Sequence, residues 1–258
     1  MKAAGRRLPE RGLRVAQRQA TGSFGAKGNF DRLVDTYGPT AVPPVTDAAP
    51  FVANDVFNKV AILASMALVA GIGAAFLKVS PALAFVAVFV ALGFAIAAMV
   101  KPSRAATFAP LFAITEGIAL GWISRVFSST NGAVVPLAII GTSVVFLAVL
   151  ASYRTGLVKV GPTFVRATLI AGLGLLAMMI ASMFGLKLPF TSQGTSTLII
   201  FGVLYLIVGV MDLFVDFAYV YKAQQAGVSK DGEWFAALSI MFSVVMIYLA
   251  LLRIFGGR

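Results

Sequence analysis

The sequence contains no cysteine and no histidine, and only 12 % of its 258 residues are charged. These absences exclude the usual zinc, haem and iron–sulfur sites, disulfides, and Ser-His or Cys-His nucleophile pairs. We therefore expect no enzyme, no catalytic residue and no resident metal or cofactor. Soluble domains carry about a quarter charged residues. The shortage of charge, with 59 % hydrophobic residues, indicates a chain whose main solvent is lipid.

Seven apolar runs are long enough to cross a bilayer, which takes about 20 helical residues. Few residues remain between these runs, so no folded domain fits outside the membrane after residue 55. The pattern predicts an all-α, polytopic membrane protein with a seven-helix transmembrane domain over residues 56–258. The expected spans are Val56–Leu77, Pro81–Val100, Ala106–Phe127, Ala133–Tyr153, Thr163–Gly185, Ser196–Tyr221 and Trp234–Phe255.

The region before the first run, residues 1–55, is rich in Gly, Pro, Arg and Ala. Residues 1–30 alone carry seven Lys or Arg against one Glu, so much of the net charge of +11 lies here. We expect a mostly disordered basic tail that is attracted to anionic lipid headgroups. Basic residues without a folded platform or interleaved aromatics give only a weak nucleic-acid signal, so we expect no nucleic-acid partner.

The positive charges also predict the orientation of the spans, because Lys and Arg concentrate in cytoplasmic segments. With seven spans, 16 of the 21 Lys and Arg fall on the side that holds the N-terminus. The sequence therefore predicts a multi-pass protein of the cell (plasma) membrane with a cytoplasmic N-terminus.

Three acids fall inside the expected spans: Glu116, Asp212 and Asp216. An ionised side chain near the bilayer centre costs about 3 kcal/mol on insertion scales, so such residues usually face a cavity or a partner. Asp212 and Asp216 are four residues apart, which places both carboxylates on one helix face about 6 Å apart. Such a pair can bind a hard cation when ionised and release it when protonated. The alternative is that Asp216 reaches the interface while Asp212 bonds to a neighbouring helix.

Glu116 and Arg253 each have two interpretations. Glu116 either lines an ion path or packs in the interior as a neutral acid. Arg253, near the end of the last span, is either a snorkelling anchor or a candidate counter-charge for a buried acid. Gly117 and Gly121 form a GxxxG pattern that allows another helix to approach closely. The run Gly172–Ala177 fits a dinucleotide fingerprint only formally, because it lies within a span, and we interpret it as small-residue packing.

Several segments resemble the Bax inhibitor family. The run Phe108–Gly121, FAPLFAITEGIALG, resembles the third-span motif of this family, and Ile247–Arg253, IYLALLR, resembles its C-terminal signature. The segments Val52–Val56 and Lys230–Trp234 are similar to the bacterial branch with a long N-terminal tail. The resemblance covers the chain from about residue 50 to its end.

This resemblance implies a seven-helix bundle and, in its bacterial members, a pH-sensitive calcium leak gated by an aspartate pair between the sixth and seventh spans. Asp216 matches the first aspartate, whereas Ser243 stands at the place of the second. Half of the pair is therefore missing. We expect Asp212, which lies one turn deeper and closer in level to Ser243, to replace the lost acid in part through a hydrogen bond to that serine.

The function predicted from these observations is a pH-responsive cation leak channel or ion-homeostasis protein of the bacterial inner membrane, with calcium as the expected ion. Asp212, Asp216 and Ser243 would form the gate, Glu116 would line the path, and Ca²⁺ would bind only transiently. The alternative is a non-conducting regulator that binds a membrane protease or another quality-control partner. Because no histidine is present, any response to pH near neutrality must come from carboxylates.

Overall fold

The computed structural model describes residues 50–155, 157–158, 160–183 and 195–257. The tail predicted for residues 1–55 lies almost entirely outside the described residues and stays a prediction. The described helices are α3 (Ala53–Phe76), α4 (Pro81–Val100), the short 3₁₀ helix η2 (Pro102–Arg104), α5 (Ala105–Thr130), α6 (Val134–Arg154), α7 (Pro162–Met183), α8 (Thr195–Gln225) and α9 (Gly232–Gly256).

The all-α, seven-helix prediction is confirmed, because each α-helix from α3 to α9 overlaps one predicted apolar run. Six of these helices are long and apolar enough to cross a membrane, and α7 contributes a shorter apolar segment, Pro162–Met178. Ser80 and Pro81 begin α4 as their types predict: the Ser80 hydroxyl accepts a hydrogen bond from the Leu83 amide at 3.3 Å, and proline occupies the first helical position.

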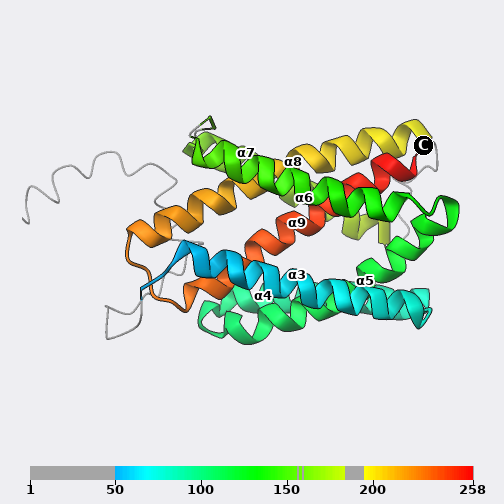
Figure 1. Ribbon diagram of the computed structural model, residues 1–258, viewed down its shortest axis with the longest axis horizontal. Coiled ribbons are helices and arrows are strands. Elements are labelled where there is room, and N and C mark those ends of the chain that lie inside the picture. The colour runs from blue at the N-terminus through cyan, green and yellow to red at the C-terminus, as the bar shows by residue number, and fades with distance from the viewer. Residues whose placement is uncertain (1–49, 156, 159, 184–194, 258) are drawn as a thin grey trace, which may run out of the picture. The chain divides into compact units, whose positions relative to one another are not determined.

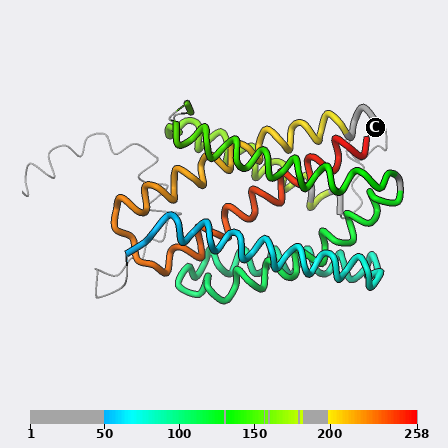
Figure 2. The backbone as a smooth tube through the Cα atoms, viewed as in Figure 1, coloured from blue at the N-terminus to red at the C-terminus, as the bar shows by residue number. Residues whose placement is uncertain are grey.

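The last helix, α9, is the centre of the bundle. It packs against α8, α3, α6 and α5, and 67 % of its most apolar stretch is buried, a larger share than in any other candidate span of the described residues. Figure 1 shows α9 between a layer of α3, α4 and α5 and a layer of α6, α7 and α8, and the backbone trace in Figure 2 shows the same order. Side chains on α9 therefore contact both layers.

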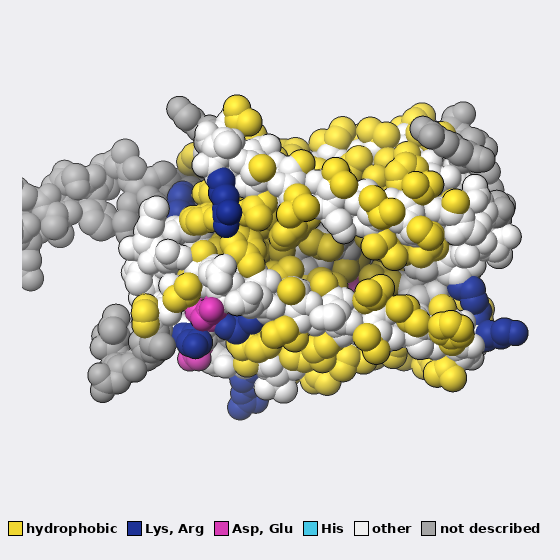
Figure 3. Space-filling model, in the orientation of Figure 1, with side chains coloured by type: hydrophobic (Ala, Val, Ile, Leu, Met, Phe, Trp, Pro, Cys, Tyr) yellow, Lys and Arg dark blue, Asp and Glu magenta, His cyan; other side chains and the backbone are white. Residues whose placement is uncertain are grey.

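The outer surface of the helices is apolar, as lipid contact requires. Large hydrophobic side chains such as Phe76, Val69 and Ile170 are 70 % or more exposed. Figure 3 shows hydrophobic side chains over the length of the helices, with the visible lysines and arginines gathered at the two ends. We call the end where α3 begins the near end and the opposite end the far end.

The close helix approach predicted from Gly117 and Gly121 takes place between α5 and α3. A Cβ atom on Gly121 would lie 2.2 Å from the Gly71 carbonyl oxygen, and one on Gly117 would lie 2.4 Å from the Ala67 carbonyl oxygen. No side chain fits at these contacts, so the two backbones touch directly. This packing fixes α5, and with it Glu116, against α3.

Replacing Gly121 by alanine is therefore expected to force α3 and α5 apart. Overpacking of this kind costs about 1–3 kcal/mol, which thermal unfolding of the protein in detergent measures. Gly73→Ala on α3 is the matched control, because no atom lies within 4 Å of the added Cβ. Equal melting temperatures for the two variants would contradict the backbone contact.

Candidate functional site

A buried carboxylate joins α8 to α9. Asp216, on α8, is 8 % exposed and accepts two hydrogen bonds from serines on α9. The Ser243 hydroxyl donates to Asp216 Oδ2 at 2.6 Å, and the Ser239 hydroxyl donates to Asp216 Oδ1. Each carboxylate oxygen therefore has its own donor from the neighbouring helix. We call Asp216, Ser239 and Ser243 the carboxylate–serine link.

The link differs from the sequence prediction in the acid that it uses. Ser243 bonds to Asp216 and not to Asp212, so the expected hydrogen bond between Asp212 and Ser243 is wrong. Helical side chains lean toward the N-terminus of their own helix. Because α8 and α9 run antiparallel, the Asp216 side chain leans toward the far end and the Ser243 side chain leans toward the near end. The carboxylate and the hydroxyl meet between the two backbones.

Ser239 was missed by the sequence prediction. A signal for it was available, since Ser239 and Ser243 are four residues apart and so share one face of α9. Two serines at this spacing, opposite an acid on the next span, supply one hydroxyl for each carboxylate oxygen. The structure thus places two neutral donors, Ser239 and Ser243, on Asp216, and Asp216 is the one acid in the link.

Asp212 lies one turn from Asp216 but faces a different helix. Its Oδ2 atom is 3.6 Å from the position that a Cβ would take on Gly172 of α7. Asp212 is partly exposed and, within the described part of the chain, forms no hydrogen bond or ion pair. Gly172, which belongs to the discounted fingerprint, therefore lies in the contact between α7 and α8, where a Cβ would meet this carboxylate at ordinary van der Waals distance.

Glu116 is partly exposed on α5 and also forms no hydrogen bond or ion pair with a described residue. The structure does not gather it with the two aspartates: no group of three acidic side chains that could hold a metal ion occurs among the described residues. Glu116 therefore stands apart from the carboxylate–serine link.

Arg253 lies toward the far end of α9. Its guanidinium stacks on the Tyr205 ring at 4.7 Å from the centroid, and the Tyr205 hydroxyl donates to the Leu175 carbonyl at 3.1 Å. Arg253 Nη1 is buried without a hydrogen-bond partner. Arg253, the candidate counter-charge, thus contacts an aromatic face. It forms no ion pair with Glu116, Asp212 or Asp216.

The chain matches a known protein family over most of its length. A family described as Bax inhibitor 1 like matches residues 12–256, which include all seven described α-helices. The chain belongs to the Bax inhibitor 1-like family. The comparison with curated proteins finds no match. Together with the apolar helices, membership makes this a multi-pass protein in contact with the lipid bilayer and suggests a link to ion homeostasis.

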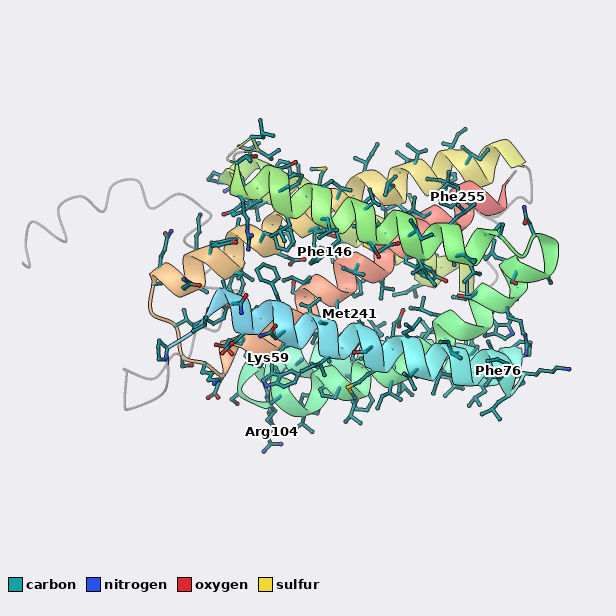
Figure 4. The ribbon with its side chains drawn as sticks, in the orientation of Figure 1. Lys59, Phe76, Arg104, Phe146, Met241 and Phe255 are labelled. Atoms are coloured by element: carbon teal, nitrogen blue, oxygen red, sulfur yellow. The ribbon has the colours of Figure 1, made fainter. Side chains whose placement is uncertain are left out.

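In this Bax inhibitor 1-like protein, the start of α3 is fastened to the near ends of α8 and α9. The Val52 amide donates to Glu233 Oε1 at 2.9 Å, and the Ala53 amide donates to Gln224 Oε1 at 2.7 Å. Side chains from two other helices thus satisfy amides that a helix start leaves free. Glu233 is fully buried, and its second oxygen pairs with Lys59 on α3 (Figure 4).

The fastening continues along the backbone. The Phe51 amide donates to the Val228 carbonyl at 3.0 Å, and Pro50 pairs with Ser229 in an isolated bridge. Lys59 also lies over the Trp234 ring, 5.4 Å from its centroid. The segment Lys230–Trp234, which carries part of the family resemblance, is therefore the place where the first and last described helices are joined.

Proposed function

We propose that this protein is a pH-responsive cation leak channel, with calcium as the expected ion, and that the carboxylate–serine link is its gate. The observation that carries the proposal is the buried Asp216 carboxylate between α8 and α9, held by one serine on each oxygen. A single ionisable group thus makes the polar contact between α8 and the central helix α9 at this level.

The chemistry of Asp216 supports a gating role. A buried carboxylate is costly unless its oxygens accept hydrogen bonds. The two serines satisfy this requirement while α8 and α9 stay together. Protonation removes the charge that strengthens both bonds, and a cation on the carboxylate competes with the hydroxyl donors. Either event favours separation of the two helices at this level.

Asp212 and Glu116 supply further oxygens in the proposed path. Carboxylate oxygens are the ligands that calcium prefers, and neither acid is committed to a described partner. The proposal treats Ca²⁺ as a transported ion that passes these acids and not as a resident cofactor. It assigns no catalytic step to the protein.

The proposed setting is the cell membrane, with the N-terminus on the cytoplasmic side. The excess of Lys and Arg on that side supports this orientation, since 16 of 21 lie there when the seven helices alternate. The near end, including Lys59 and the turn before α9, then faces the cytoplasm.

Calcium flux into proteoliposomes that contain the full chain tests the proposal. We expect wild-type protein to pass Ca²⁺ at a rate that depends on pH, and the double variant Asp212→Asn, Asp216→Asn to lose that dependence. Asp55→Asn is the matched control, because it makes the same chemical change at an exposed acid near Lys230, outside the proposed path.

Two results would contradict the proposal. Wild-type protein that passes no Ca²⁺ at any pH would remove the conducting function. A double variant with the same flux and pH profile as Asp55→Asn would show that Asp212 and Asp216 do not form the gate. A folded, non-conducting protein that still co-purifies with a membrane protease would support the regulator instead.

A further inference from the structure

Five aromatic rings gather at the near end, where α3, α6 and α8 meet. Phe217 of α8 is the centre of this group and is fully buried. Phe57 of α3 lies 5.7 Å from it and Phe146 of α6 lies 5.5 Å from it, both edge to face, and Tyr153 lies at 6.4 Å. Tyr221 extends the group by stacking on Tyr153 at 5.3 Å. We call these five rings the aromatic cluster.

The aromatic cluster lies where two layers of the bundle would otherwise be apart. α3 packs on α5 and α9, whereas α6 packs on α9 and α8. Figure 3 shows the surface hollowed between α3 and α6, and Figure 4 shows Phe146 between these two helices. Through Phe57 and Phe146, α3 and α6 both contact the ring of Phe217. This ring therefore fills the space between them at the near end.

Phe217 is also tied to the carboxylate–serine link by its position in the chain. It follows Asp216 directly, and successive residues of an α-helix point about 100° apart. The carboxylate consequently faces α9 while the ring faces α3 and α6. A movement of α8 relative to α9 that breaks the link also displaces the ring from Phe57 and Phe146.

We propose that the aromatic cluster is the barrier that closes the ion path, and that the link to α9 holds Phe217 in this barrier. The proposal rests on the proposed channel function. Apolar constrictions stop ions because water does not fill them and a cation does not shed its water to enter. The link then acts as the trigger and the ring as the obstacle, both on one turn of α8.

Phe217→Ala tests the barrier, because it removes the ring that the other contacts share. With the link intact, we expect Ca²⁺ flux into proteoliposomes to rise about tenfold or more, as for removal of a hydrophobic constriction. Phe85→Ala is the matched control: this ring lies on α4, is 42 % exposed and is 4.9 Å from Phe89, far in sequence from the link. Leakage of a trapped anionic dye should stay at the control rate.

A second variant covers the case in which Phe217→Ala does not fold. Phe146→Leu keeps most of the volume and removes one edge-to-face contact, so we expect a smaller rise in Ca²⁺ flux. Folded Phe217 and Phe146 variants that conduct as slowly as Phe85→Ala, while Ser239 and Ser243 variants change the flux, would overturn the barrier alone. Absence of flux in all of these proteins would overturn the channel and the barrier together.

Discussion

Replacing Ser239 and Ser243 together by alanine is expected to destabilise the protein and to raise its calcium leak. Hydrogen bonds to a charged group contribute about 1.5–3 kcal/mol each, and the double variant leaves the buried Asp216 carboxylate without a donor. The helices α8 and α9 then lose the polar contact that holds them together at this level. Thermal unfolding in detergent measures the first effect, and proteoliposome flux measures the second.

A double-mutant cycle separates the link from a general loss of hydroxyl groups. In an Asp216→Asn background the charge is already absent, so the two serine replacements should cost much less. Ser143→Ala is the matched control, because this exposed hydroxyl on α6 bonds only to the Ile139 carbonyl of its own helix, at 3.0 Å. Equal costs in the aspartate and asparagine backgrounds would show that the serines do not act through Asp216.

Lys59→Met is expected to give a large loss of stability, comparable to that of the double serine variant. It leaves the fully buried Glu233 charge without its partner, and breaking a buried ion pair from one side costs about 3–5 kcal/mol. The same glutamate also accepts a hydrogen bond from the Val52 amide at the start of α3. Thermal unfolding in detergent should therefore show a clear fall in melting temperature. The double variant Lys59→Met, Glu233→Gln should recover part of the lost melting temperature, because the buried charge is then also removed.

Lys230→Met provides the control for this prediction. Lys230 lies 4.0 Å from Asp55, and both side chains are at least 40 % exposed. Exposed pairs of this kind contribute about 0–1 kcal/mol, so the variant should melt close to wild type. A Lys59 variant that is no less stable than the Lys230 variant would contradict the role assigned to the buried pair.

The sequence predicted the helices well because length and composition decide them. Each apolar run is long enough to span lipid, and most of the runs are bounded by Pro, Gly or charged residues, so the seven helices could be placed before the structure was known. The sequence predicted less well which helices pack against each other. Gly117 and Gly121 predicted a close approach, but a small residue does not say which helix approaches it, and only the structure identifies α3.

The site could be predicted only in part. The sequence pointed to Asp216 and Ser243 as facing positions, but counting turns along the helix axis put Ser243 opposite Asp212. The direction in which each side chain leaves its helix pairs Ser243 with Asp216 instead. The Lys59–Glu233 pair was not predicted, because its members are 174 positions apart and the pattern of the sequence does not show that the two helix starts meet.

A reversible lock between α8 and α9 tests the central claim most directly. A Cβ on Gly209 would lie 3.4 Å from the Cβ of Met246, close to the roughly 3.5–4.5 Å that a disulfide spans, and the chain has no other cysteine. With Gly209→Cys and Met246→Cys, oxidation should stop Ca²⁺ flux into proteoliposomes, and a membrane-permeant reductant should restore it. Flux that is the same in the oxidised and reduced protein would contradict a gate between these helices.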